Sequence, residues 1–160
     1  MVMEENIVST VMDDLQGKFL TFHIEDTIYG IELLHVIEII SIQNATRIPN
    51  VPAYIKGIIN LRGKIVPVID VRLKFKQSER AYDEKTCIIV VVIEDMQVGL
   101  IVDRVSEVVT VDQAELANPP ELGTTSNEKY LQSIATVGEK VVLNIDCHKF
   151  FHSDLNYTKI

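Results

Sequence analysis

Hydrophobic and polar residues alternate most regularly between Ile55 and Phe75, in the segment IKGIINLRGKIVPVIDVRLKF. The pattern predicts two strands joined by a turn at 60–63. Successive side chains of a strand point to opposite faces, so each face of the second strand can be considered separately. One face is apolar throughout: Ile65, Pro67, Ile69, Val71, Leu73 and Phe75. The other is half apolar and half charged: Lys64, Val66, Val68, Asp70, Arg72 and Lys74. We interpret the first face as part of a core and the second as a surface that binds proteins.

Several other segments show the same short-range alternation between turn signals. It predicts strands at 18–24, 28–32, 86–93, 97–102, 130–134 and 140–147. Helical turns are expected at the start of 33–40, at 50–54 and after His148. Residues 1–17 and 154–160 are expected to be flexible tails on either side of a single domain that spans 18–153.

An internal repeat organises these elements. Residues 23–42 align with 92–111, and residues 54–75 align with 130–151, each without a gap. A half of about 70 residues buries little surface alone, so we expect the halves to pack together or to exchange strands. Short strands with frequent turns favour small barrels over a parallel sheet. The repeat therefore predicts two barrel halves, at about 18–80 and 81–153.

The repeat also separates residues that the fold requires from residues that it does not. Gly30 aligns with Gly99, which indicates a structural glycine at a bulge or at a close approach of two chain segments. In contrast, Arg62 aligns with Gly138 and Gly57 aligns with Ser133. We therefore interpret Arg62 and Gly57 as residues that serve binding rather than folding.

Composition and charge narrow the class of partner. The formal net charge of −8 and the pI near 4.9 argue against nucleic acid, whose phosphates would repel such a surface. Residues 1–10 lack the features of a signal peptide, and the apolar stretch 87–93 is far shorter than the roughly 20 residues of a membrane helix. We expect a cytoplasmic protein without membrane insertion. Cys87 and Cys147 are expected to be buried free thiols, with a disulfide as the alternative.

Candidate catalytic and metal-binding residues are few. His148 and His152 have the i,i+4 spacing that zinc can use, yet no third ligand stands at a convincing spacing. The sequence shows no Gly-rich phosphate loop and no G-x-S-x-G motif. We expect no cofactor, no metal and no catalytic residue. The alternative function is a ligand-binding or enzymatic small β-barrel with a pocket between the halves.

Several motifs together resemble the CheW family of chemotaxis coupling proteins. They are Tyr29-Gly30-Ile31, Val36-Ile37-Glu38-Ile39, Ile55-Lys56-Gly57, Asn60-Leu61-Arg62-Gly63, Ile65–Asp70 and Gly99–Val105. The resemblance covers about Lys18 to Phe151. It implies an all-β fold of two SH3-like, five-stranded β-barrels with short helical turns and a shared hydrophobic core. It also implies a non-catalytic adaptor that joins the cytoplasmic tips of methyl-accepting chemoreceptors to the regulatory domain of the histidine kinase CheA in membrane-associated arrays.

The resemblance further implies which residues bind receptor and kinase: Val36, Glu38, Gly57, Asn60, Leu61, Arg62 and Gly63. Asn60 and Gly63 suit the first and last positions of a type I turn. The guanidinium of Arg62 suits bidentate pairing with a carboxylate of a partner, and a solvated turn arginine is the alternative. Glu38 recurs in the second half as Glu107, so pairing with a basic side chain of its own barrel stays open. Val36 recurs as Val105, so core packing stays open as its main role.

Overall fold

The structure is a computed structural model, and it describes residues 14–118, 128–152 and 154. The strands are β1 (Lys18–Ile24), β2 (Thr27–Glu32), β3 (Val36–Ser41), β4 (Ile55–Leu61), β5 (Lys64–Asp70), β6 (Cys87–Ile93), β7 (Met96–Val102), β8 (Arg104–Thr110), β9 (Leu116–Ala117), β10 (Leu131–Val137) and β11 (Lys140–Ile145). The helical turns are η1 (Leu33–His35), α2 (Val71–Lys74), η2 (Gln113–Glu115), η3 (Glu128–Tyr130) and α3 (Cys147–Phe151). The predicted all-β class with short helical turns is confirmed. The two predicted tails lie largely outside the described residues.

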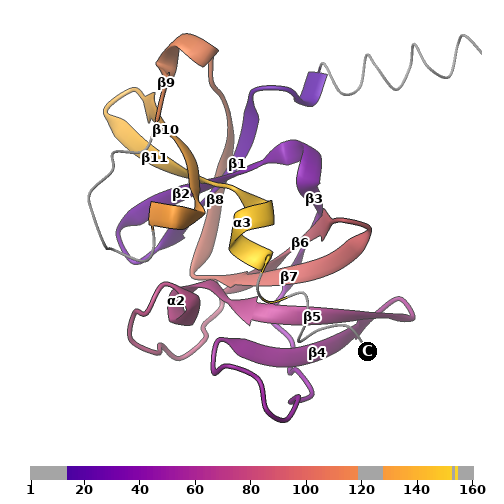
Figure 1. The fold of residues 1–160 in the computed structure, drawn as a ribbon. Coiled ribbons are helices and arrows are strands. Elements are labelled where there is room, and N and C mark those ends of the chain that lie inside the picture. Colours follow the sequence, from indigo (N-terminus) through magenta and orange to yellow (C-terminus); the bar gives the residue numbers. More distant parts are fainter. Residues whose placement is uncertain (1–13, 119–127, 153, 155–160) are drawn as a thin grey trace, which may run out of the picture.

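The strands form two sheets that lie one above the other in Figure 1, with α3 between them. Sheet A has six strands in the order β8-β1-β2-β11-β10-β9, and sheet B has five in the order β3-β6-β7-β5-β4. Each sheet contains one parallel pair, β2 with β11 in sheet A and β5 with β7 in sheet B. The sheets are therefore equivalent in topology, as the repeat predicts.

Each sheet takes strands from both sequence repeats. The hairpin β1–β2 pairs with β8 and β11, and the hairpin β6–β7 pairs with β3 and β5. The predicted division into barrel halves at 18–80 and 81–153 is wrong in this respect, because a boundary near residue 80 cuts through both sheets. The reason is that a hairpin leaves both its edges unpaired, and here the other repeat supplies the partner strands. Of the two arrangements expected, strand exchange is the one found.

The main hydrophobic core lies between the sheets and contains residues of both. Its buried members include Phe22, Ile31, Val71, Leu100 and Phe150. Two smaller clusters lie within the sheets, one in sheet B and one in sheet A. The shared core expected from the family resemblance is thus present. Separating the two sheets would expose it to water, which the hydrophobic effect opposes.

The repeat-related glycines lie at the two parallel strand pairs. Gly30 on β2 is opposite Asn144, and Gly99 on β7 is opposite Val68. A Cβ atom at Gly30 would lie 2.3 Å from Oδ1 of Asn144, and one at Gly99 would lie 2.7 Å from Cγ2 of Ile88. The predicted close approach is confirmed, and it explains why both repeats have glycine at this position.

The strand predicted for 64–75 is shorter than expected, and its second face is not a binding surface. β5 ends at Asp70, whose carboxylate caps the short helix α2. Val66 and Val68 are buried. The cause is that both faces of β5 are covered, because Val66 and Val68 belong to the hydrophobic cluster of sheet B and Ile69 belongs to the main core. The prediction that Ile65 lies on the core face is wrong, because its side chain is 59% exposed.

Residues 50–54 form a turn rather than the predicted capped helical turn. Asn50 has a φ of 61°, a left-handed conformation that asparagine tolerates and that differs from the extended backbone of a helix cap. The N–H group of Ile55 donates to the carbonyl of Pro52 over 3.0 Å. The turn therefore leads directly into β4.

Both cysteines are free thiols, as predicted. Cys147 is buried, and burial raises the pKa of its thiol to about 12. Cys87 is only half-buried, and burial raises the pKa of its thiol as well. Both thiols are therefore held in their unreactive protonated form at neutral pH.

A buried ion pair crosses the junction between the two repeats. Nζ of Lys74, in α2, donates hydrogen bonds to the carboxylate of Asp154 and to the carbonyl of Phe150. The side chains of Lys74 and Asp154 are each 2% exposed. Burial lowers the pKa of Lys74, and the hydrogen bond and charge of Asp154 oppose that shift. The pair ties α2 of the first repeat to the segment that follows α3 of the second.

Asp154→Ala is expected to lower the free energy of unfolding by about 3 kcal/mol, because it leaves the buried ammonium of Lys74 without its counter-ion. The double variant Lys74→Met/Asp154→Ala is expected to recover most of that loss, since it removes the unpaired charge. Urea denaturation of the three proteins checks both expectations. Equal destabilisation of the single and double variants would contradict them.

Candidate functional site

Arg62 and Glu38, two of the residues expected at the site, form an ion pair. Nη1 and Nη2 of Arg62 donate to the two carboxylate oxygens of Glu38 over 2.7 and 2.8 Å. Glu38 lies on β3 and Arg62 follows β4, so the pair joins the two outermost strands of sheet B. The side chain of Arg62 is 75% exposed and that of Glu38 is 20% exposed. Glu38 thus pairs with a basic side chain of its own barrel, which is the alternative that the repeat left open.

The turn between β4 and β5 holds Arg62 away from the sheet. Arg62 and Gly63 are its central residues, with φ values of 53° and 82°. Oδ1 of Asn60 accepts a hydrogen bond from the N–H group of Gly63 over 3.0 Å. Our interpretation of a type I turn was wrong, because two positive φ values are typical of type I′. That turn matches the right-handed twist of the strands of a two-residue hairpin.

Val36 and Leu61 contribute packing to the site. Both are half-buried. Val36 lies against the main core, and Leu61 lies against the hydrophobic cluster of sheet B. Core packing, the alternative considered for Val36, is therefore what the structure shows. These contacts fix β3 and the end of β4, and with them the two partners of the ion pair.

Gly57 has a structural role that its repeat partner Ser133 does not reveal. Its φ is 137°, and a Cβ atom there would lie 2.0 Å from the carbonyl oxygen of Thr46. Thr46 and Ile58 exchange two backbone hydrogen bonds of 2.8 Å, which hold the β3–β4 loop against β4. Our interpretation that folding does not need Gly57 was wrong. The glycine allows this loop to pack against the strand.

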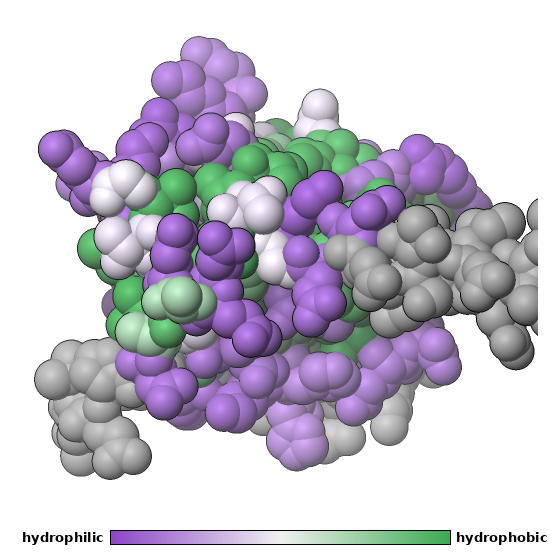
Figure 2. Space-filling model, turned by 90° about the horizontal axis from the view of Figure 1, so that it is seen from above, coloured by the Kyte–Doolittle hydropathy of each residue, from purple (hydrophilic) through white to green (hydrophobic). Residues whose placement is uncertain are grey.

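The sequence did not predict that two pairs of apolar residues are exposed. Ile39 on β3 and Ile65 on β5 are 45% and 59% exposed; Ile39 follows Glu38 directly in the chain, and Ile65 follows the turn that carries Arg62. In sheet A, the equivalent residues in the repeat are Val108 and Val141, at 48% and 54%. Figure 2 looks down from the side of sheet A and shows hydrophobic surface bordered by hydrophilic side chains. The repeat alignment could have shown the equivalence, but alternation alone does not predict exposure.

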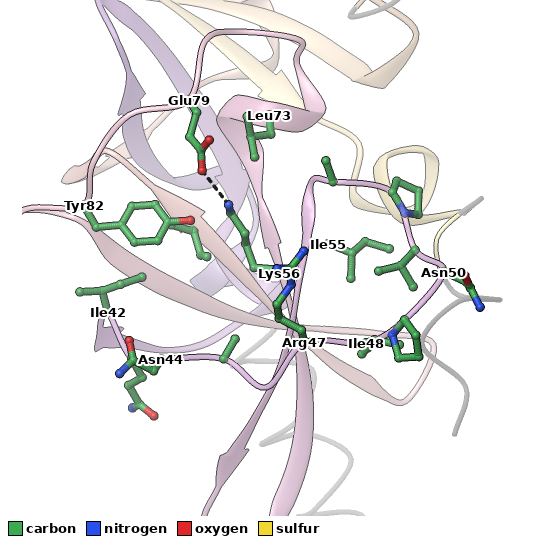
Figure 3. A pocket seen from close by; sticks show the side chains of 17 residues that line it. Ile42, Asn44, Arg47, Ile48, Asn50, Ile55, Lys56, Leu73, Glu79 and Tyr82 are labelled. Atoms are coloured by element: carbon green, nitrogen blue, oxygen red, sulfur yellow. Dashed lines mark hydrogen bonds and ion pairs between the residues drawn. The ribbon is translucent and has the colours of Figure 1, made fainter.

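A concave surface lies beside the β3–β4 loop of sheet B, and Ile101 on β7 adds a residue of the second repeat to its lining. Figure 3 shows Lys56 near its centre, joined to Glu79 by an ion pair of 3.1 Å. Its other titratable lining residues are Arg47 and Tyr82. Burial, together with a hydrogen bond to Asp70, raises the pKa of Tyr82. The lining thus offers no nucleophile paired with a base, and the enzymatic alternative has no support there.

Two of the histidines, His35 and His148, lie close together at another surface. The rings of His35 and His148 lie 6.3 Å apart, and each is within 4.0 Å of a glutamate carboxylate, Glu32 or Glu94. Within the described residues, no three His, Cys, Asp or Glu side chains are placed to share a metal ion. In the same part of the chain, no helix is long and apolar enough to cross a membrane.

The fold and these surfaces define a class of small β protein, a pair of SH3-like barrels fused by exchanged hairpins. The family model of the CheW-like domain matches residues 18–155. The chemotaxis protein CheW of Klebsiella aerogenes is 39% identical over 148 residues, which cover 92% of this chain and 89% of that protein. The chemotaxis protein CheW of Treponema pallidum is 31% identical over 150 residues, covering 91% and 88%.

A solved structure agrees with the sequence comparisons. The scaffolding protein TtCheW from Thermoanaerobacter tengcongensis superposes with a TM-score of 0.80 at 35% identity, covering 86% of this chain and 94% of that chain. Both kinds of similarity extend over most of the molecule. The chain belongs to the CheW family of chemotaxis proteins.

Gly57→Ala is expected to lower the free energy of unfolding by more than about 2 kcal/mol, because the new methyl group meets the carbonyl of Thr46 and the backbone is strained. Gly63→Ala is the matched control: its φ is also positive, at 82°, but nothing lies within 4 Å of the added Cβ. It is expected to cost only about 1 kcal/mol. Chemical denaturation measures both, and equal losses would contradict the assigned role of the Thr46 contact.

Proposed function

We propose that this chain is a non-catalytic adaptor that couples methyl-accepting chemoreceptors to the regulatory domain of the histidine kinase CheA. Membership of the CheW family supports the chemotaxis role. The similarity to TtCheW, a scaffolding protein, supports the adaptor role. The adaptor would act in the cytoplasm, recruited to receptor arrays at the membrane by its partners.

The Arg62–Glu38 pair is the observation that carries this proposal. Three-quarters of the Arg62 side chain is exposed, although both its outer nitrogens already bind Glu38. A partner carboxylate can therefore approach the guanidinium from outside without first removing a buried charge. Such a pair is preorganised, because the fold holds the guanidinium in place before binding.

The exposed apolar residues beside this pair give the partner a surface to bury. Ile37 and Ile39 on β3 and Ile65 on β5 are all more than 40% exposed. An apolar patch beside a fixed ion pair has the mixed composition of transient protein interfaces. The regulatory end of CheA contains the same kind of domain, so we assign this end of sheet B to contact with it, barrel to barrel.

The two ends of the molecule would differ in what they recognise. The end of sheet A repeats the apolar pair as Val108 and Val141, but Gly138 stands in place of Arg62. A partner that needs the guanidinium would therefore bind only at sheet B. Two similar ends that differ in one charged residue would let an adaptor bind different partners at its two ends, since a charged contact discriminates between otherwise similar surfaces.

Reconstitution of CheA autophosphorylation with receptor fragments tests the proposal. Addition of this chain is expected to raise the rate of phosphorylation, and Arg62→Glu is expected to lose most of that stimulation. The substitution should cost only about 1 kcal/mol of folding stability, because the Arg62 side chain is 75% exposed. Lys64→Glu, an equal charge change at an exposed neighbouring residue, is the control and should retain stimulation.

The exchanged pair Glu38→Arg/Arg62→Glu separates binding from folding. It is expected to restore the stability lost in Arg62→Glu but not the stimulation, because the cation would now lie on β3. Full recovery of stimulation would show that the pair acts only within the fold. No effect of the unaltered chain on the kinase would contradict the adaptor function itself.

A further inference from the structure

Basic side chains surround a cavity of about 610 Å³ at the surface formed by η3 and α3. The described residues that line it are Lys129, Tyr130, His148, Lys149 and His152. We propose that this cavity binds a small phosphate-bearing molecule, and that Lys129 and Lys149 are the cations that hold the phosphate. The inference goes beyond the adaptor function and does not depend on it.

The lining is positively charged on an acidic chain. Lys129 and Lys149 are exposed, and no carboxylate of the described residues lines the cavity. Within the described part of the chain, the lysines that have a carboxylate partner are Lys56 and Lys74, which leaves both lysines of the cavity without one. The whole chain has a net charge of −8, so the charge at this surface is opposite in sign to the average. Such a local concentration of positive charge attracts small anions.

The equivalent helix of the first repeat shows how the chain neutralises cations that serve the fold. α2 carries two buried cations, Arg72 and Lys74. Asp103 pairs with Arg72, and Asp154 pairs with Lys74. The side chain of Lys149 on α3 is exposed instead, and no described carboxylate pairs with it. Packing therefore does not require the charge of Lys149, which is accessible to a ligand.

The ring of Tyr130 brings the second lysine of the cavity close to the buried Lys74. Nζ of Lys129 lies 5.0 Å from the centroid of this ring, and Nζ of Lys74 lies 5.1 Å from it. The ring attracts both ammonium groups but leaves two like charges near each other. Burial lowers the pKa of Lys74, and the charge of Lys129 adds to that shift. An anion bound beside Lys129 would reduce this repulsion.

The donors of the cavity favour phosphate over carboxylate. A lysine ammonium is a compact charge with three donors and commonly binds phosphate, whereas the planar fork of arginine matches a carboxylate. The described lining contains two lysines and no arginine. His148 and His152 each add an N–H donor even when they are neutral, although Glu94, 3.7 Å from Nδ1 of His148, competes for that residue.

The size of the cavity favours a small molecule. Its volume of about 610 Å³ lies within the roughly 300 to 1,000 Å³ of ordinary ligand sites. Tyr130 gives it an aromatic wall beside the cations, as expected for a site that holds a phosphate joined to an organic group. The i,i+4 histidine spacing noted in the sequence thus belongs to an anion site, since no metal-binding group exists among the described residues.

Calorimetric titration of the full chain with inorganic pyrophosphate tests the inference. Pyrophosphate is expected to bind at a single site, and Lys129→Glu/Lys149→Glu is expected to weaken binding by about tenfold or more. The neutral variant Lys129→Gln/Lys149→Gln should weaken it as well, with less effect on folding. Urea denaturation checks that each variant is folded.

Lys64→Glu/Lys140→Glu is the matched control. It makes the same charge change at two exposed lysines, the repeat-equivalent first residues of β5 and β11. This variant should bind pyrophosphate as the unaltered chain does. Equal weakening in the control and in Lys129→Glu/Lys149→Glu would overturn the proposal, because the effect would then come from net charge alone.

Citrate separates recognition of phosphate from attraction of any anion. It carries a similar charge on carboxylates and is expected to bind about tenfold more weakly than pyrophosphate. Equal binding of the two, or no binding of pyrophosphate, would overturn the proposal. Cosedimentation with vesicles of phosphatidic acid without binding of pyrophosphate would also overturn it, because the surface would then bind lipid. Neither kinase nor receptor enters these measurements, so their outcome is independent of the adaptor function.

Discussion

The exchange of hairpins between the two repeats is the constraint on which the rest of the structure depends. β1–β2 completes the sheet built by the second repeat, and β6–β7 completes the sheet built by the first. Neither repeat contains all the strands of either sheet, and the main core lies between sheets that share the chain in this way. The buried pair of Lys74 and Asp154 adds a second link across the same junction. Folding of the two barrels is therefore coupled, and their surfaces are held in fixed relation.

A fixed relation between surfaces is what a coupling protein requires. The Arg62–Glu38 pair lies at one end of sheet B, and Val108 and Val141 lie on sheet A. A shift of a partner at one surface can move a partner at another only if the body between them does not deform. The function we propose thus follows from the rigidity of the exchanged fold more than from any single residue.

The sequence predicted the strands, the repeat and the close-approach glycines, because alternation and self-similarity record local structure and packing directly. It did not predict which strands pair, since both repeats carry equivalent strands and only the whole chain decides the partner. It predicted Arg62 and Glu38 as site residues but did not predict that they form an ion pair. The contact joins the two outermost strands of sheet B, which are far apart in the order of the sheet. It misjudged Gly57, whose requirement arises from Thr46, in a loop that lies outside both aligned repeat blocks.

The most direct test is to divide the chain in the loop between β5 and β6 and to study the fragments 1–80 and 81–160. Far-UV circular dichroism should show each fragment unfolded alone, because each lacks strands of both sheets. Mixing them should restore the spectrum of the intact chain in a one-to-one complex. If either fragment folds cooperatively on its own, the strand exchange is not what holds the two barrels together.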